Sequence, residues 1–318
     1  MTNSKDFIPS KFVYDIAKIA QEAAIGASKM RGQGDEKLAD KAAVDAMRNA
    51  LNEINIKGRV VIGEGERDEA PMLYIGEEVG TGNGPEIDIA LDPLEGTTLC
   101  AKNQANSLAV IAMAKKGNLL YAPDVYMEKL AIGPGYLTDV VHIDNSPEVN
   151  IQNLAKAKGV STSDIKVCIM DRDRHADMIA KVRTTGAQIK LIGDGDVAAV
   201  IETAKGNIDI YMGIGGAPEG VLASAALRCI GGQMYGRLIL DTAEKLERAK
   251  NMGIVDGNKI YRENEMAKGN VIFAAAGVTN GELLKGVDIN KNRILTECLV
   301  MCSDTKSTHH IKTETSLV

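Results

Sequence analysis

The second half of the chain alternates segments typical of strands with segments typical of helices, and this pattern restricts the fold more than any other feature. Residues 167–170 form a short apolar run typical of a buried strand, whereas the apolar side chains of residues 174–184 recur at helical spacing. Further strands are predicted at 189–192, 208–212 and 271–275, and further helices at 197–204 and 218–230. This alternation predicts a parallel sheet packed by helices, with ligands at the carboxyl ends of its strands.

The first half begins with two amphipathic helices. One spans about residues 11–30, and the other carries Val44, Met47 and Leu51 on its apolar face. Strands are predicted at 60–62, 86–92, 107–114 and 118–122, the last two as a hairpin. A polar stretch at 145–153 marks a boundary, so we expect an α/β protein with two sub-domains, 1–155 and 156–318.

Composition excludes several classes of protein. The formal net charge is −6 and only 3% of residues are aromatic, so a nucleic-acid partner is not expected. No apolar run is long enough to cross a membrane, and the first residues lack the apolar core of a signal peptide. Five cysteines without a paired motif suggest reduced thiols. We therefore expect a cytoplasmic protein with no membrane partner.

Acidic side chains are concentrated in one segment. Residues 64–95 contain ten carboxylates and a single base, Arg67. Glu64, Asp92 and Glu95 follow strands that we expect to be buried, where unpaired carboxylates are costly. One arginine cannot neutralise them, but divalent cations can. Because the segment has no Cys or His, its oxygen ligands favour Mg²⁺ or Mn²⁺ over zinc. The alternative, a solvated acidic loop, is the better interpretation for glutamates 77, 78 and 86.

Two further features of this region point to a phosphate site. Asp40 lies on the same helix face as Val44 and Met47, so it needs a partner in the interior unless it only caps the helix end. In the segment 92–98, Pro93 fixes the chain and Gly96 permits the close approach of a ligand. The threonines that follow read as a helix start, where free N–H groups favour an anion such as phosphate.

Competing motifs fail. A haloacid-dehalogenase phosphatase needs Asp or Thr two positions after its nucleophilic Asp, where this chain has Leu94. Pro218 breaks a dinucleotide-binding fingerprint in the glycine-rich segment 213–218. A Walker-type phosphate loop is absent from the sequence. The acidic segment therefore has no simpler explanation among common phosphate-handling motifs.

Three segments, 63–76, 92–97 and 213–220, resemble class II fructose-1,6-bisphosphatase, a family of the lithium-sensitive, metal-dependent sugar and inositol phosphatases. The resemblance extends from about residue 17 to 315. It implies a layered α/β/α/β/α fold, Mn²⁺ or Mg²⁺ as cofactor, a phosphorylated sugar as substrate, and a cytoplasmic homo-oligomer, dimer or tetramer. Class II members commonly have Pro where this chain has Asp173, so the loop here is less rigid.

The resemblance also implies roles for individual residues. The implied metal ligands are Asp40, Glu64, Asp92, Glu95 and Glu219. Asp68 and Thr97 would be the catalytic pair that positions and deprotonates the attacking water. The implied substrate contacts are Glu95, Gly96, Thr97, Tyr126, Arg172, Asp173, Arg174, Asp194, Gly195, Asp196 and Gly216. Without the resemblance, ordinary structural or solvated positions explain several of these residues equally well, namely Tyr126, Arg172, Arg174, Asp194 and Asp196.

The expected activity is hydrolysis of the 1-phosphate of fructose 1,6-bisphosphate to fructose 6-phosphate for gluconeogenesis. Sedoheptulose-1,7-bisphosphatase and inositol-monophosphatase-like activities remain alternatives within the enzyme class. A non-catalytic metal or phosphosugar sensor is the alternative from another class. The presence of both Asp68 and Thr97 argues against a sensor, because a sensor has no need to activate water.

Overall fold

The computed structural model describes residues 7–65 and 72–317 and divides the chain into two compact units. The first unit contains residues 1–121 and 267–318, and the second contains residues 122–266. This division differs from the boundary near residue 155 that the sequence suggests. Strand pairing explains the difference, because strand β5 (Tyr126–Ile132) pairs with strands of the second unit and the last strands of the chain return to the first.

The first unit is built on a mixed sheet of eight strands among the described residues. Their order is β12-β13-β11-β4-β3-β1-β2, and β14 pairs with β13. The bounds are β1 (Lys57–Ile62), β2 (Glu78–Val79), β3 (Glu86–Glu95), β4 (Leu108–Lys115), β11 (Val271–Gly277), β12 (Asp288–Ile289), β13 (Arg293–Cys302) and β14 (Ser307–Ser316). Only β1 and β3 are paired in parallel among these described strands.

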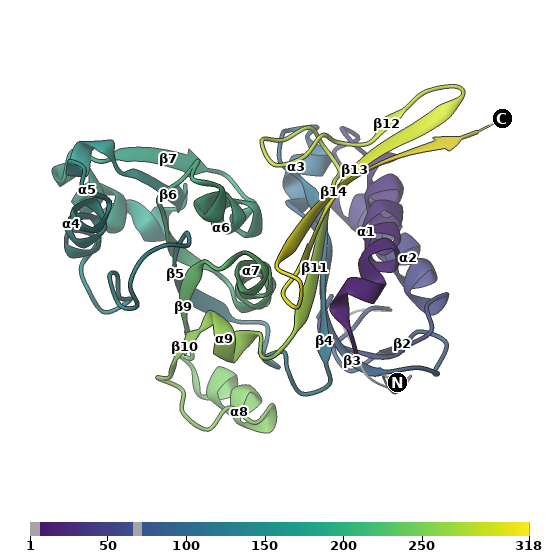
Figure 1. Ribbon diagram of the computed structural model, residues 1–318, viewed down its shortest axis with the longest axis horizontal. Helices are drawn as coiled ribbons and strands as arrows, with labels where there is room; N and C mark the ends of the chain where they lie inside the picture. Colours follow the sequence, from purple (N-terminus) through teal and green to yellow (C-terminus); the bar gives the residue numbers. More distant parts are fainter. Residues whose placement is uncertain (1–6, 66–71, 318) are drawn as a thin grey trace. The chain divides into compact units, whose positions relative to one another are not determined.

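Two long helices cover one face of this sheet (Figure 1). They are α1 (Val13–Ser28), which follows the short 3-10 helix η1 (Pro9–Phe12), and α2 (Glu36–Asn52). The side chain of Asp35 caps α2 by accepting a hydrogen bond from the Leu38 N–H. Alanines and aliphatic side chains of both helices are buried with the sheet in one hydrophobic core. Both helices predicted for this part of the chain are therefore confirmed.

The predicted hairpin at residues 107–122 is wrong. Strand β4 forms as expected, but it lies between β3 and β11 rather than beside the segment 118–122. That segment makes only an isolated bridge between Leu119 and Ala267. Turn-like residues after β4 mark where the chain leaves the sheet, and the partner of β4 comes from residues far away in the sequence.

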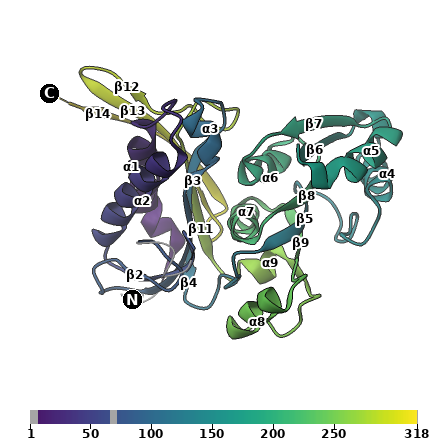
Figure 2. The same ribbon diagram turned by 180° about the vertical axis from the view of Figure 1, so that it is seen from behind.

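The second unit contains a sheet of six strands among the described residues, in the order β10-β9-β5-β8-β6-β7. The strands not yet given are β6 (Lys166–Met170), β7 (Gln188–Ile192), β8 (Ile210–Gly216), β9 (Gln233–Leu238) and β10 (Ile260–Arg262). The helices are α4 (Pro147–Lys158), α5 (Ala176–Thr184), α6 (Asp196–Lys205), α7 (Ala217–Ile230), α8 (Ala243–Asn251) and α9 (Glu263–Met266), with 3-10 helices η2 (Thr162–Asp164) and η3 (Asp173–His175). Helices α4 and α5 lie on one face of the sheet, and α6 and α7 lie on the other (Figures 1 and 2).

The mixed α/β fold in two sub-domains is confirmed, with two principal layers in the first unit and three in the second. The predicted all-parallel order is only partly correct. Strands β6, β7 and β8 are parallel, whereas β5, β9 and β10 pair antiparallel. The strand predicted at 271–275 is β11 of the other sheet, where both of its neighbours are antiparallel. In the described segments, no helix has the length and apolar character needed to cross a membrane.

Candidate metal and phosphate site

Two of the predicted metal ligands leave neighbouring parallel strands at the same end. Strand β1 pairs in parallel with β3, and Ile62 lies opposite Ala90. Glu64 comes two residues after Ile62, and Asp92 comes two residues after Ala90. The carboxyl ends of β1 and of the regular part of β3 therefore bring these two carboxylates to one edge of the sheet, as expected for a ligand site in an α/β protein.

The end of strand β3 adds a second carboxylate beside Asp92. Pairing with β4 is irregular between Asp92 and Glu95, so the strand bends there. One carboxylate oxygen of each residue lies within 4.8 Å of the other, while a carboxylate oxygen of Asp92 accepts a hydrogen bond from Leu94 N–H at 2.9 Å. Ser107 Oγ donates to the carbonyl of Glu95 at 3.1 Å and fixes this bend. Two acidic side chains this close repel each other unless a cation lies between them.

Gly96 makes the turn from β3 into helix α3 (Thr97–Ala101). Its φ of 76° is left-handed, and a Cβ there would lie 2.9 Å from Leu99 Cδ1, so glycine meets both demands. The hydroxyl of Thr97 donates to the carbonyl of Leu94 at 3.0 Å. Its lone pairs can still accept a hydrogen bond from a water molecule. The turn therefore holds a glycine backbone and a hydroxyl directly beside Glu95.

Asp40 lies on helix α2, which packs against both β3 and α3. It is half-buried on the side of the helix that carries the buried Val44. Burial raises the pKa of Asp40 above its ordinary value. A carboxyl group that is partly desolvated gains most from a cation when it ionises, which fits the predicted role. Asp68, the other predicted acid of this region, lies outside the described residues.

The second unit brings three predicted substrate residues together. Tyr126 at the start of β5 lies opposite Gly216 at the end of β8. The guanidinium of Arg174 lies over the Tyr126 ring, 4.8 Å from its centroid. Its Nε and one terminal nitrogen donate to the carbonyl of Ile214, at 3.0 and 2.7 Å. An exposed tyrosine and an arginine fixed by the backbone thus flank the glycine-rich end of β8.

Asp194, Gly195 and Asp196 form the loop that starts helix α6. The side chain of Asp194 accepts a hydrogen bond from Gly195 N–H at 3.0 Å. Asp196 is buried, and its Oδ2 accepts hydrogen bonds from Lys129 Nζ at 2.7 Å and from Tyr211 Oη at 3.2 Å. The three predicted residues therefore differ in exposure, and Asp196 belongs to an interior ion pair.

Lys129 is a functional candidate that the sequence reasoning missed. Its side chain is fully buried, and its only recorded partner among the described residues is Asp196. The signal was present in the sequence of β5, because Lys129 alternates with Met127 and Ala131, which both belong on a buried face. A lysine at an interior position of a strand requires a buried carboxylate as partner.

Arg172 and Asp173 lie exposed at the start of η3. The guanidinium of Arg172 donates to the carbonyl of its neighbour Asp171 at 3.2 Å. Asp173 is the first residue of η3, and its carbonyl accepts the N–H of Ala176. The turn therefore forms without the proline common in class II members.

His175 is the last residue of η3, and its ring forms a hydrogen bond with the backbone of β8. Its Nε2 accepts the N–H of Ile214 at 2.8 Å, while its Nδ1 bonds the carbonyl of Met170 at 2.8 Å. The ring must be neutral to accept from Ile214, and burial lowers its pKa below the ordinary value. The ring thereby links β6 to β8 at the predicted substrate site.

This histidine makes stability depend on pH. Because the folded-state pKa lies below the unfolded value of about 6.5, the contribution of His175 is complete above that pH and is lost as pH falls through the folded pKa. We expect the free energy of unfolding to drop more between pH 7.5 and 5.5 in the native chain than in His175→Gln. Urea unfolding at both pH values measures this, and equal drops in the two proteins would contradict it.

Glu219 lies in the first turn of helix α7, directly after Gly216, the helix cap. A Cβ on Gly216 would overlap Glu219 Oε2, so the carboxylate fills the space that a side chain would occupy. Gly216→Ala should push the carboxylate away while the backbone, with φ −64° and ψ 144°, accepts alanine. Because Glu219 is a predicted metal ligand, we expect roughly a 10- to 100-fold loss of kcat/KM and of Mn²⁺ affinity, with little change in melting temperature. Unchanged Mn²⁺ affinity would contradict this.

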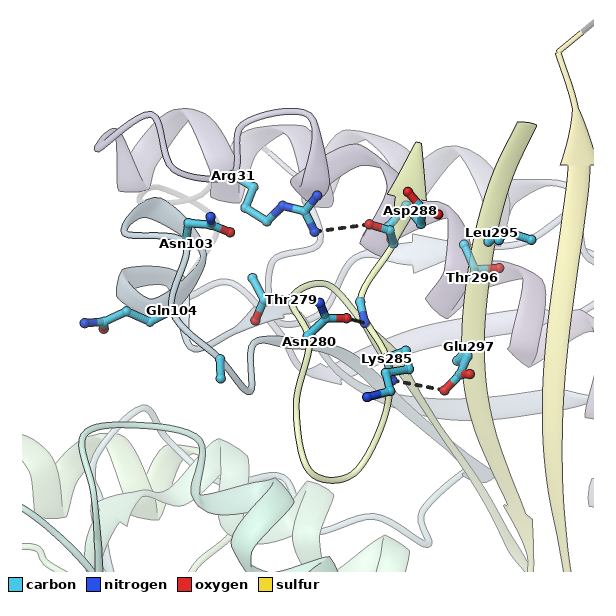
Figure 3. Close-up of a pocket in the computed structure, with 13 residues that line it drawn as sticks. Arg31, Asn103, Gln104, Thr279, Asn280, Lys285, Asp288, Leu295, Thr296 and Glu297 are labelled. Atoms are coloured by element: carbon cyan, nitrogen blue, oxygen red, sulfur yellow. Dashed lines mark hydrogen bonds between the residues drawn. The ribbon is translucent and has the colours of Figure 1, made fainter. Parts of the chain in front are cut away.

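A cavity of about 700 Å³ opens elsewhere in the first unit (Figure 3). Two cations and two anions line it, Arg31 and Lys285 against Asp288 and Glu297, so their charges cancel. Arg31 donates to the carbonyl of Val287 at 3.1 Å, and Glu297 accepts the N–H of Lys285 at 3.0 Å, so both serve the local fold. Of the described residues around this cavity, none is a predicted metal or substrate residue.

Comparison with known proteins settles the family. The family described as "Bacterial fructose-1,6-bisphosphatase, glpX-encoded" matches residues 10–315. The chain belongs to this family. It is therefore a phosphatase of the fructose-bisphosphatase type, and its family depends on a metal ion.

Relatives and solved structures extend this comparison. The D-fructose 1,6-bisphosphatase class 2/sedoheptulose 1,7-bisphosphatase of Synechococcus sp. strain JA-3-3Ab is 44% identical, over 96% of this chain and 95% of the relative. The protein of the same name from Thermosynechococcus vestitus is 44% identical, over 94% of each chain. A solved structure, Mycobacterium tuberculosis SuhB, matches 79% of this chain and 100% of its own length, with 14% identity and a TM-score of 0.39.

Proposed function

We propose that the chain hydrolyses the 1-phosphate of fructose 1,6-bisphosphate, giving fructose 6-phosphate and inorganic phosphate. One observation carries the proposal: Glu64 and Asp92 leave adjacent parallel strands at the same end, beside Glu95 and the Gly96 turn. Carboxylates next to a glycine turn at a helix start combine cation ligands with a place for a phosphoryl group. Family membership identifies the phosphoryl donor as a sugar bisphosphate.

The proposed metal ligands are Asp40, Glu64, Asp92, Glu95 and, from helix α7, Glu219. All are carboxylates, which are the ligands preferred by Mg²⁺ and Mn²⁺. The close approach of Asp92 to Glu95 and the raised pKa of Asp40 fit such ions. When bound, a divalent cation would neutralise charge on the phosphoryl oxygens and lower the pKa of a nearby water.

The Gly96–Thr97 turn would hold the scissile phosphate through its backbone N–H groups. Thr97 would accept a hydrogen bond from the attacking water and orient it toward phosphorus. For Asp68 to take a proton through Thr97, the hydroxyl must give up its hydrogen bond to the Leu94 carbonyl. Attack on phosphorus breaks its bond to the sugar oxygen, and this oxygen takes up a proton from solvent and leaves as a hydroxyl group, which balances the proton that the attacking water gives to Asp68.

The second phosphate and the sugar would bind at the end of β8. Arg174 lies beside Tyr126 and Gly216, and Arg172 is exposed nearby in sequence, so the two guanidinium groups suit a phosphate. Asp194 and Gly195 would contact the sugar. Asp196 would act with Lys129 mainly by fixing the start of α6, because both side chains are buried.

We place this activity in gluconeogenesis, in a cytoplasmic homo-oligomer, dimer or tetramer. A second candidate activity is hydrolysis of sedoheptulose 1,7-bisphosphate, because the relatives carry both activities in their names. Both substrates are ketose bisphosphates with the same reacting group. The predicted contacts to the phosphates do not separate them.

A phosphate-release assay tests these proposals. The protein is first treated with a chelator and then titrated with Mn²⁺ or Mg²⁺, using fructose 1,6-bisphosphate, sedoheptulose 1,7-bisphosphate and inositol 1-phosphate as substrates. We expect no turnover after chelation, recovery with either ion, and activity on the two bisphosphates only. Turnover that survives chelation would refute the metal site, and a preference for inositol phosphate would refute the proposed substrate.

A further inference from the structure

Strand β14 is a long strand with one open edge. Its ten residues pair with β13 along their whole length, and no described strand pairs with its other edge. The segment contains no proline, which would remove an N–H from the edge, and its charged side chains restrict which strands can pair with it. The outer parts of β13 and β14 extend beyond helices α1 and α2 as a ribbon (Figures 1 and 2). Such an edge is a template for another strand.

Hydrogen bonding identifies which residues face the open edge. The N–H of Leu317 donates to the carbonyl of Asn292, which directly precedes β13, so the backbone of Leu317 faces β13. The carbonyl of Arg293 accepts from the N–H of Asn290 and so faces the edge of β13 away from β14. Backbone groups alternate in direction along a strand, so odd-numbered residues of β14 bond β13. The even-numbered residues present N–H and C=O groups outward; these are Thr308, His310, Lys312, Glu314 and Ser316.

The same even-numbered side chains form an exposed polar row on the face away from α1, and Lys312 and Glu314 are its charged members. Lys312 pairs with Glu297 at 2.7 Å, and Glu314 pairs with Arg293 at 3.3 Å. The odd-numbered face packs toward α1, where Thr313 bonds Gln21. On the even-numbered face, Lys312 and Glu314 therefore differ in sign from each other, and each pairs with an opposite charge on β13.

This charge order selects one register for pairing with a second copy. We consider two copies of β14 that pair antiparallel about a two-fold axis perpendicular to the sheet. In each possible register, one central residue lies opposite its own copy. A residue that follows the centre by a given number of positions then lies opposite the residue that precedes the centre by the same number. A centre at Lys312 or at Glu314 sets like charges face to face. A centre at Ile311 sets Lys312 opposite His310. Only a centre at Thr313 sets each Lys312 directly opposite a glutamate, Glu314.

We propose that β14 pairs antiparallel with β14 of a second copy of this chain, centred on Thr313, and joins the two sheets into one. Across the interface, the charges then follow the order Glu297, Lys312, the partner's Glu314 and the partner's Arg293, and their signs alternate. The outward N–H and C=O groups of residues 310, 312, 314 and 316 gain partners. This pairing specifies the surface of the homo-oligomer and does not depend on the proposed substrate.

Cross-linking tests the register. Lys312→Cys and Glu314→Cys are prepared separately, mixed, allowed to exchange subunits, and oxidised. Opposite residues in such a pair have Cα atoms about 5.5 Å apart, within disulfide range, whereas like residues lie about 8 Å apart. We expect disulfide-linked dimers in the mixture and few in either variant alone. The native cysteines are buried and do not compete. No cross-link, or equal cross-linking of each variant alone, would overturn the proposal.

A proline variant tests the edge itself. Glu314→Pro removes an outward N–H but none of the hydrogen bonds to β13, so each chain should still fold. We expect light scattering to show half of the native oligomer mass. The matched control, Lys181→Glu, changes an exposed lysine that pairs with Asp177 in the second unit and should keep the native mass. A monomeric native chain, or an unchanged mass in Glu314→Pro with folding verified by circular dichroism, would overturn the proposal.

Discussion

Glu95→Gln should lower kcat by about 1000-fold or more while the chain remains folded. The substitution keeps the shape of the side chain but removes the charge of a buried group beside Asp92. Loss of this proposed anionic ligand would weaken cation binding and charge neutralisation at phosphorus, and about 4 kcal/mol of lost transition-state stabilisation corresponds to that factor. Phosphate release measures the effect on rate, and titration with Mn²⁺ followed by electron paramagnetic resonance measures metal affinity independently.

Glu86→Gln is the matched control for this experiment. Glu86 lies at the other end of the same strand, is exposed, and pairs with Lys116 at 2.9 Å. It should keep native activity and native Mn²⁺ affinity, because an exposed ion pair contributes little. If Glu95→Gln behaved like this control in both measurements, Glu95 would not be a metal ligand.

The largest effect on stability is expected from Lys129→Met. The substitution leaves Asp196 as a buried carboxylate whose strongest partner is gone, with Tyr211 as its remaining recorded donor among the described residues. Removing one member of a buried ion pair typically costs about 3–5 kcal/mol. Urea denaturation should show this loss, and activity should fall as well because the start of α6 is no longer fixed.

The double variant Lys129→Met/Asp196→Asn distinguishes a lost ion pair from a packing defect. The asparagine carries no charge, so the double variant has no buried carboxylate without a cationic partner. We therefore expect much of the lost free energy of unfolding to return. If the double variant lost as much stability as the two single variants lose together, burial of an unpaired carboxylate would not explain the effect of Lys129→Met. Circular dichroism verifies that each variant retains its native secondary structure.

Local patterns predicted most individual elements, but they did not predict which strands become neighbours. The helix expected at 218–230 corresponds to α7, and the strand expected at 271–275 corresponds to β11. The sequence pattern places β11 in the wrong sheet, because its apolar residues suit any buried strand. Pairing depends on contacts between distant segments, such as β11 with β4, and periodicity carries no information about them.

The site shows the same division between local and distant information. Asp92, Glu95 and Gly96 form one short motif that reads clearly from the sequence. The sequence around Glu77 favours a solvated loop, yet Glu77 is buried and its Oε1 accepts a hydrogen bond from Arg48 Nε at 2.6 Å. Its partner lies on α2, so the adjacent glycines and polar residues gave no sign of it. The role of Lys129 depends on the equally distant Asp196.

Strand β11 lies between β4 and β13 in the sheet, but it is synthesised long after β4. During synthesis, β4 emerges early, but its second neighbour is made only after all of residues 122–266. Until β11 is made, the almost entirely apolar strand β4 has no partner for the N–H and C=O groups along one of its edges. We therefore expect this edge to be the part of the nascent chain most exposed to aggregation until β11 pairs with it.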